Sequence, residues 1–428
     1  MISPAPAYVG AGHINSNKQV LTLTNFDPLL GSPEFFENPY PVYRRLREEA
    51  PVFWSAAWNA WVLTRHADVV AIHRDPRTFS SHGRVSAQLD RLPEPTRSEV
   101  GLLRKHYAVG LTHSDPPDHT RLRALVSKSF APSLIESLRP KFEAMTAELL
   151  DAVDGKQAFD VMEALAYPLP ATIIAVMLGA PASDCGLLRK WAFDVNNLHA
   201  RPGQPDPEIT LATQRGLADF RAYLADLIED HRRHPQVDVL SHLIAAREQG
   251  DALTDDELVS TCVTLFVAGH ETTTHALCNG LIALLRHPAQ LAQLRAEPAR
   301  LPEALEELLR YDTSVQRSAR RVTQDVDISG QRLRAGQIAL GMIGAANRDP
   351  ALCAEPDTLD ITRPAVKHSA FGFGIHFCLG APLARMEIPI ALRQLLARFP
   401  RLALDPARPP RWRRDVALRG VDALWVAA

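Results

Sequence analysis

Hydrophobic and polar positions repeat with a helical period over most of the chain. From Thr120 to about Pro302, apolar residues recur every three to four positions, as in amphipathic helices. Proline-containing segments interrupt this pattern, because proline lacks an amide donor and clashes with the preceding helical turn. The predicted breaks lie near Pro132 and at 168–170, 202–207 and 234–235.

Shorter elements flank this helical region. Residues 40–49 and 67–74 predict helices, and residues 61–64 predict a strand. After Asp312 the pattern alternates, and residues 321–328, Ser329-Gly330 and 331–340 predict a β-hairpin or small sheet. Residues 80–117 are interrupted by glycine and proline and predict a long loop, of the kind that often forms a lid.

The chain has no internal repeat and no low-complexity linker. Its 428 residues would suffice for about three domains of average size. Helical periodicity nevertheless continues without a clear boundary, so we expect one large domain over residues 21–428, after a loose leader at 1–20. The predicted fold class is mainly α with a minor β-sheet region.

Composition excludes several classes of protein. Hydrophobic residues make up 46% and charged residues 22%, which is ordinary for a globular chain. Lys+Arg 47 against Asp+Glu 49 gives a net charge of -2, so no basic field indicates a nucleic-acid or membrane partner. The N-terminus has no apolar signal segment, and no apolar stretch reaches the ~20 residues that span a bilayer. We therefore expect a soluble, cytoplasmic protein.

The cysteines are few and scattered. No two form a CxxC pair, which excludes zinc-ribbon, thioredoxin-like and iron–sulfur sites, and an odd count in a long chain argues against a disulfide framework. They are Cys185, Cys262, Cys278, Cys353 and Cys378.

The segment around Cys378 carries the most chemical information. It reads FGFGIHFCLGAPLAR, at residues 371–385, and a predicted helix follows it and ends near Phe399. Amides at a helix N-terminus stabilise a thiolate, and a thiolate in an apolar, glycine-rich loop can ligate a haem iron. The alternative is a buried structural cysteine. A dinucleotide-binding GxGxxG loop is excluded, because Phe377 stands at the third glycine position.

This segment closely resembles the haem-binding loop of the cytochromes P-450, F-G-x-G-x-H/R-x-C-x-G. The chain is identified by it as a member of that superfamily, similar to the soluble bacterial enzymes. The resemblance implies the cytochrome P-450 fold, haem b (iron protoporphyrin IX) as cofactor, and Cys378 as the iron ligand. It also implies contacts from Phe371 and Gly380 to the haem.

A long helix with a polar centre supports the same family. Thr254-Asp-Asp-Glu257 forms a capping box that opens a helix to Arg286, and AGHETTT occupies residues 268–274. An HExxH zinc site is excluded, because Thr274 stands where the second histidine is needed. A solvated helix turn is the plain alternative.

The sequence at 268–272 resembles the family's A-G-x-D/E-T motif. The resemblance implies that Ala268 and Gly269 leave room for dioxygen beside the haem. It assigns Thr272 as hydrogen-bond donor to the oxygen and Glu271 as a member of the proton relay.

Two further sets of residues match the family pattern. Glu307 and Arg310 resemble the structural ExxR pair, but Thr358 stands where the family usually adds a basic residue, so the third partner is open. Haem propionates need cationic donors. The pattern assigns this role to His119, Arg123, Arg320 and His376.

The reaction implied by the resemblance is monooxygenation of a lipophilic small molecule by dioxygen. Electrons are expected from a separate ferredoxin or flavodoxin with its reductase, docked on a patch that includes Arg121, Lys128 and Arg385. We expect a monomer. A hydrogen-peroxide-dependent peroxygenase and a non-enzymatic haem-based sensor are the alternatives. The predicted substrate pocket includes Thr264, Val267, Ala268, Val315, Gln316, Ala417 and Leu418.

Overall fold

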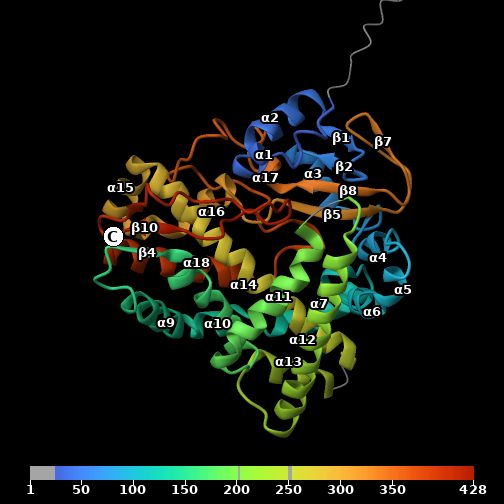
Figure 1. Cartoon of the computed structure of the whole chain (residues 1–428), viewed down its shortest axis with the longest axis horizontal. Coiled ribbons are helices and arrows are strands. Elements are labelled where there is room, and N and C mark those ends of the chain that lie inside the picture. The colour runs from blue at the N-terminus through green and yellow to red at the C-terminus, as the bar shows by residue number, and fades with distance from the viewer. Residues whose placement is uncertain (1–24, 201–202, 249–252) are drawn as a thin grey trace, which may run out of the picture.

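One long helix, α14 (Asp255–Arg286), crosses the helical part of the protein (Figure 1). The computed structural model describes residues 25–200, 203–248 and 253–428, so the predicted leader at 1–20 lies outside the described residues. The capping box is formed: the amide of Glu257 donates to the Thr254 hydroxyl at 3.2 Å, and the Thr254 amide donates to the Glu257 carboxylate at 2.8 Å.

Apolar side chains bury α14 on nearly all sides, because other helices pack around it. These helices are α10 (Pro168–Met177), α11 (Cys185–Ala200), α12 (Pro207–Arg233), α16 (Leu301–Tyr311) and α18 (Ala381–Arg398). The predicted proline breaks are confirmed, since α8 and α10 begin at prolines, α11 and α12 are separate helices, and α12 ends at Arg233.

Shorter helices complete the helical part. They are α1 (Pro33–Glu37), α2 (Tyr40–Glu49), α3 (His66–Arg74), α4 (Arg84–Leu89), α5 (Thr96–Glu99), α6 (Gly101–Ala108), α7 (Asp118–Lys128), α8 (Pro132–Ser137), α9 (Arg139–Asp151), α13 (Val239–Glu248), α15 (Pro288–Ala296) and α17 (Ile343–Ala346). Single turns of 3₁₀-helix are η1 (Leu111–His113), η3 (Ala182–Asp184), η4 (Pro298–Arg300) and η5 (Gly374–His376), and η2 (Met162–Ala166) is a π-helical turn.

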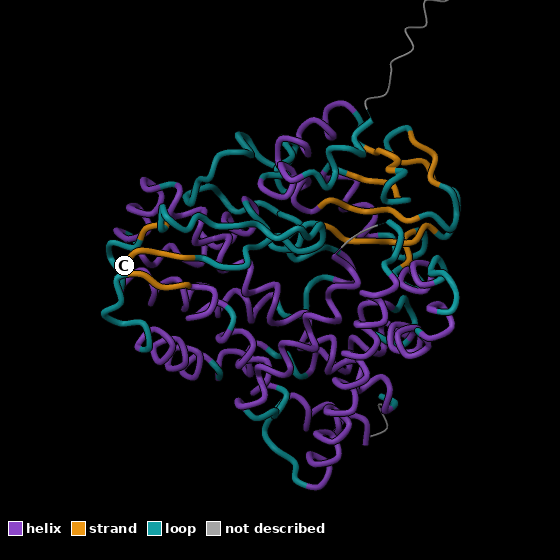
Figure 2. The backbone as a smooth tube through the Cα atoms, in the orientation of Figure 1, coloured by secondary structure: helices purple, strands orange, loops and turns teal. Residues whose placement is uncertain are grey.

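In the described part of the chain, three small sheets lie beside the helices (Figure 2). The largest has the order β1-β2-β8-β5-β3, and only its β2–β8 pair is parallel. Its strands are β1 (Val52–Ser55), β2 (Ala60–Leu63), β8 (Ile338–Met342), β5 (Arg317–Val322) and β3 (Phe79–Ser80). The others are β4 (Ala158–Asp160), β10 (Trp425–Ala427) and β9 (Ala403–Leu404), and the hairpin β6 (Val326–Ile328) and β7 (Gln331–Leu333).

Two local predictions are wrong. Residues 80–117 are not one long loop, because they form α4, α5, α6 and η1, whose apolar residues such as Val85, Leu89 and Leu103 are buried in the main core. The predicted strand 331–340 is divided in two. Its first part closes the hairpin with β6, whereas β8 lies between β2 and β5 in the larger sheet, where it is mostly buried.

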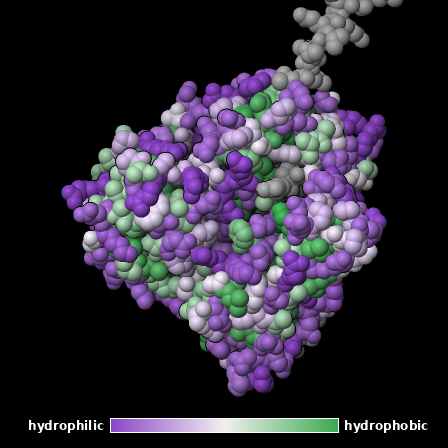
Figure 3. Space-filling model, viewed as in Figure 1, coloured by the Kyte–Doolittle hydropathy of each residue, from purple (hydrophilic) through white to green (hydrophobic). Residues whose placement is uncertain are grey.

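The apolar residues form one large cluster among the helices and two smaller ones beside the larger sheet. The face shown in Figure 3 is mostly hydrophilic, with small hydrophobic areas between polar residues. Among the described residues, no helix combines the length and the apolar character that crossing a membrane would require. The structure is therefore mainly helical with minor sheets, as predicted.

Candidate active site

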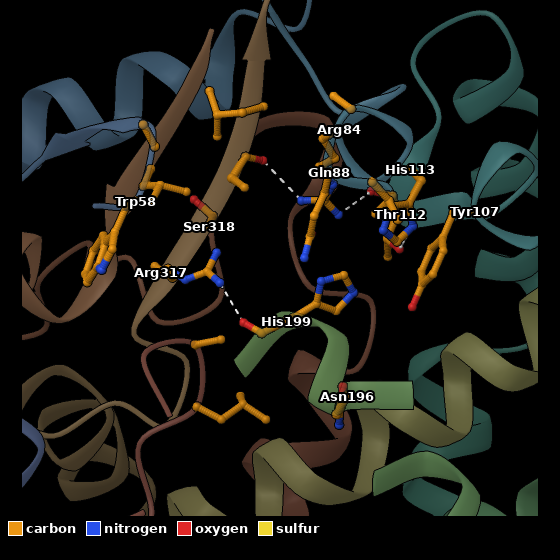
Figure 4. Close-up of a pocket in the computed structure, with 18 of the residues that line it drawn as sticks. Trp58, Arg84, Gln88, Tyr107, Thr112, His113, Asn196, His199, Arg317 and Ser318 are labelled. Carbon is orange, nitrogen blue, oxygen red and sulfur yellow. Dashed lines mark hydrogen bonds between the residues drawn. The ribbon is translucent and has the colours of Figure 1, made fainter. Parts of the chain in front are cut away.

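A cavity of about 680 Å³ lies between α14, β5, α4 and the end of α11 (Figure 4). Most of the predicted pocket residues line it. These are Thr264, Val267, Ala268, Val315, Ala417 and Leu418.

Gln316 does not belong to this lining. Its side chain is 3% exposed, accepts a hydrogen bond from the Tyr43 hydroxyl at 3.1 Å and donates one to the carbonyl of Thr313 at 2.7 Å. Neighbouring residues of an extended segment point in opposite directions. Val315 and Arg317 therefore face the cavity, while Gln316 faces the core.

The polar centre of α14 presents two different surfaces. Ala268 and Thr272 line the cavity, and the Thr272 hydroxyl donates to the Ala268 carbonyl at 2.8 Å. Gly269 faces the other way: a Cβ at this position would lie 2.6 Å from Cγ1 of Ile174 on α10. The missing side chain of Gly269 therefore allows α10 and α14 to pack closely, and its place beside dioxygen stays a prediction.

Glu271 is a buried residue of α14 and lies outside the cavity lining. Its carboxylate accepts hydrogen bonds from Asn196 and from Nη1 of Arg413, the latter at 2.7 Å. Burial would raise the pKa of Glu271, but His275 and Arg413 hold it below its usual value. The Arg413 guanidinium also lies 2.7 Å from Nε2 of His275. Glu271 is therefore an ionised, paired carboxylate, and Asn196 connects it to the cavity wall.

The Cys378 loop has the tight geometry that its glycines predict. The Cys378 amide donates to the Phe371 carbonyl at 2.9 Å. Gly374 adopts φ +69, and a Cβ there would lie 2.3 Å from the His73 carbonyl, so only glycine fits. Helix α18 begins just after the loop, with Gly380 at its N-cap, and packs against α14.

Cys378 differs from the two cysteines on α14, Cys262 and Cys278, which are fully buried. It is exposed, but enough protein surrounds its sulfur that burial raises the pKa of the thiol. The amides of Gly380 and Ala381 and the charge of Arg123 act in the opposite direction. The predicted amide donors are present, but they do not produce a thiolate alone. A coordinated metal ion would deprotonate this sulfur.

Cationic and imidazole groups from three distant segments meet beside this loop. The rings of His119 on α7 and His376 lie 4.3 Å apart, and the Nε2 atoms of both are buried without a partner. Arg320 on β5 is 6% exposed and donates to the neighbouring Ala319 carbonyl. Burial and the charge of Arg320 lower the pKa of His376 to about 2. Unpaired buried donors next to Arg320 and Arg123 fit the carboxylates of a haem.

Comparison with known proteins agrees with this geometry. The family model for Cytochrome P450 matches residues 212–411. Cytochrome P450 CYP107DY1 of Priestia megaterium is 39% identical over 381 residues, covering 87% of this chain and 92% of that protein. This chain belongs to the cytochrome P450 family.

Two other cytochromes P450 extend the match over nearly the whole chain. The polyketide biosynthesis cytochrome P450 PksS of Bacillus subtilis is 37% identical, over 92% of this chain and 96% of its own. The solved structure of P450BioI, in complex with a hexadec-9Z-enoic acid-ligated acyl carrier protein, superimposes with a TM-score of 0.84. It is 35% identical and covers 93% of this chain and 100% of that one. The chain is thus a haem-thiolate cytochrome P450 monooxygenase.

The P450 ExxR pair is buried and has a third partner. Arg310 donates to Glu307 through Nε at 2.6 Å and Nη2 at 2.8 Å. Thr358 offers its carbonyl to Arg310 at 3.2 Å, and the basic partner is Arg363, whose Nε lies 3.2 Å from Oε1 of Glu307. Another basic residue, five positions further along the chain, thus takes the place of the usual one.

Residues expected on the P450 redox-partner surface already hold ion pairs. Arg385 donates to Glu306 at 2.7 and 2.8 Å and lies over the Phe371 ring, and Arg121 is bonded to Glu257. Phe377, beside the cysteine, is exposed.

Several residues that line the P450 cavity are not marked by any motif in the sequence. Arg84, Arg317, Asn196 and His199 come from α4, β5 and α11, and no motif singles them out. Arg317 could have been considered from the sequence, because it lies in the same segment as Arg320 and has no role in the family pattern.

Proposed function

We propose that this cytochrome P450 carries haem b between α14 and the Cys378 loop and inserts one atom of dioxygen into a largely apolar small molecule. The observation that carries the proposal is the convergence of His119, Arg123, Arg320 and His376 beside Cys378. These donors would hold the propionates, and Cys378 would ligate the iron. When bound, the haem supplies activation of dioxygen, which needs two electrons and two protons.

The residues of this chain then position the substrate and supply protons. The small side chain of Ala268 leaves space in the cavity beside α14, and Thr272 presents a hydroxyl there. Glu271, the preceding residue on α14, offers a carboxylate that Arg413 and Asn196 bind, and it would accept and return protons in the relay. This acid–hydroxyl pair favours a dioxygen-using enzyme over a peroxygenase or a sensor.

The substrate class is proposed from the cavity and from the relatives. Its lining combines apolar residues such as Val263 and Leu418 with arginines, histidines and amides. PksS is named for polyketide biosynthesis, and P450BioI binds a fatty-acyl carrier protein. We propose that electrons come from a separate ferredoxin or flavodoxin.

The first test is the carbon-monoxide difference spectrum of the reduced protein. The Soret band typical of a thiolate-ligated ferrous carbonyl is expected for the native chain and is expected to be lost in Cys378→Ala. A haem-loaded native protein without that band would overturn the proposal. Substrate-dependent NAD(P)H consumption with added ferredoxin and reductase, with label from isotopic dioxygen in the product, separates the monooxygenase from both alternatives.

A further inference from the structure

Two guanidinium groups line the same cavity. Arg84 opens α4 and Arg317 lies on β5, two elements far apart in sequence. Figure 4 shows both side chains beside the same open space, with His199 of α11 next to them.

Both guanidinium groups are held by backbone carbonyls. Arg84 donates to the carbonyls of Ala319 and Thr112, each at 3.1 Å, and Arg317 donates to the carbonyl of His199 at 2.6 Å. The Nε atoms of both arginines are buried and have no partner. Within residues 25–200, 203–248 and 253–428, no carboxylate lies within ion-pair distance of either side chain. Neutral carbonyls orient the two groups, while Asp415 attracts Arg317 and Asp115 attracts Arg84 from beyond ion-pair distance.

The described cavity wall carries one carboxylate against three arginines. Asp415 is the single acidic residue of the described lining, and its carboxylate accepts the amides of Ala417 and Leu418 at 2.7 and 3.0 Å. Arg91 adds a third cation at the wall. Burial lowers the pKa of His199 to about 3, so its imidazole is neutral. The cavity wall therefore carries a net positive charge.

The part of the wall formed by α14 and the C-terminal segment is mostly apolar, with Val263, Val267, Ala268 and Leu418. A ligand that matches both parts has an apolar body and an anionic group. Arginine suits a carboxylate because its planar donors can bind both oxygens. We propose that the substrate is a largely apolar carboxylic acid whose carboxylate binds to Arg317 and Arg84.

This proposal rests on the proposed function, since it names the substrate class of the same site. The competing explanation is that both arginines only fasten loops through backbone carbonyls. Such a role would affect the binding of acids and of neutral ligands equally. The preference for an acid over its own methyl ester separates the two explanations, because the ester keeps the apolar body and removes the charge.

The test is equilibrium dialysis of the purified full-length holoprotein, which reads binding without using the haem spectrum. The probes are tetradecanoic acid and deoxycholic acid, each against its methyl ester. For at least one pair we expect the acid to bind about 10-fold or more tightly, as charge-assisted hydrogen bonds predict. Arg317→Gln and Arg84→Gln should bring acid and ester within about 3-fold of each other, while Arg317→Lys should keep part of the preference. Arg104→Gln, which changes a surface ion pair with Asp90, is the matched control and should behave as the native chain.

Equal binding of acid and ester in both pairs overturns the proposal. It is also overturned if neither acid binds. A preference that survives both glutamine variants overturns the assignment of Arg317 and Arg84. The reduced carbon-monoxide spectrum, recorded on the same samples, reports separately on the proposed function. A normal thiolate band without an acid preference removes only the carboxylate inference.

Discussion

The Nε atom of Arg363 lies 3.2 Å from Oε1 of Glu307 and supplies the positive charge that Thr358 does not. Both side chains are nearly buried, and Arg363 also donates to the carbonyls of Ala354, Glu355 and Thr358. One arginine thus joins the buried ExxR pair to the segment leading toward the cysteine loop.

Replacing this arginine should weaken the fold. Arg363→Ala removes one of two cations from Glu307, and we expect a loss of about 1–3 kcal/mol in the free energy of unfolding. Urea denaturation measures it, with Arg393→Ala, which changes an exposed pair with Glu143, as the control. Equal midpoints for the two variants would contradict the role given to Arg363.

Two glycines of α14 should respond in opposite ways to replacement by alanine, because Gly269 faces α10 closely and Gly280 faces α16 with more room. Gly269→Ala places a Cβ 2.6 Å from Ile174, and we expect a destabilisation of about 1–3 kcal/mol. Gly280→Ala meets Leu308 at 3.4 Å, an ordinary contact, and should gain up to about 1 kcal/mol from helix propensity. Thermal unfolding compares the stability of the two variants. In the double variant Gly269→Ala and Ile174→Ala the clash should be relieved, while the stability lost by shortening the core side chain at 174 should remain.

The pair of Glu271 and Arg413 predicts a pH-dependent stability. In the native chain the lowered pKa of Glu271 contributes stability that is present above the ordinary pKa of a carboxyl group and is lost as pH falls through the folded-state value. In Arg413→Gln, burial of Glu271 with one cation fewer should raise that pKa. We expect a deficit of about 2–4 kcal/mol near neutral pH that narrows on acidification to about pH 5.

Urea midpoints of the native and Arg413→Gln proteins across this pH range provide the measurement. Arg139→Gln, which changes an exposed pair with Glu136, is the control and should show a small, nearly constant difference. A deficit for Arg413→Gln that stays constant between the two pH values would show that Glu271 does not titrate as stated.

Removing the Thr272 hydroxyl should uncouple NAD(P)H consumption from product formation. Thr272→Ala should retain the reduced carbon-monoxide band but form product about 10²-fold or more slowly, because it removes a positioned proton donor. Product formed per NAD(P)H consumed measures the effect, with a substrate chosen by its spectral shift. Thr273→Ala is the matched control, since that hydroxyl bonds the Gly269 carbonyl and lies outside the cavity lining. Similar coupling in the two variants would refute the assignment to Thr272.

The charged donors near His376, Arg320 and Arg123, should help the protein to retain haem. Arg320→Ala and Arg123→Ala each remove a charged donor, so haem should dissociate about 10-fold or more readily. The haem-to-protein ratio after extended dialysis is the readout, with Arg104→Ala on the surface as control. Unchanged haem content in both variants would remove these residues from the propionate site.

Much of the fold and part of the site follow from short stretches of sequence. The capping box at Thr254 acts on backbone groups a few residues away, so its effect is encoded locally. The turn at Gly374 can be read from the glycine, but its close approach to His73 cannot. The local pattern of residues 80–117 predicts a loop because its helices are short and their burial depends on contacts with distant elements.

The sequence by itself determined the cysteine loop, the polar centre of α14 and the mainly helical fold, because each depends on spacing within one segment. Only the tertiary structure decided that Arg363 replaces the basic residue expected at Thr358, that Gln316 turns from the cavity, and that Arg413 holds Glu271. It also brought Arg84 and Arg317 to one cavity. These relationships join residues distant in the chain or depend on which way a side chain faces. Packing sets both, and local periodicity carries no information about the partner across the core.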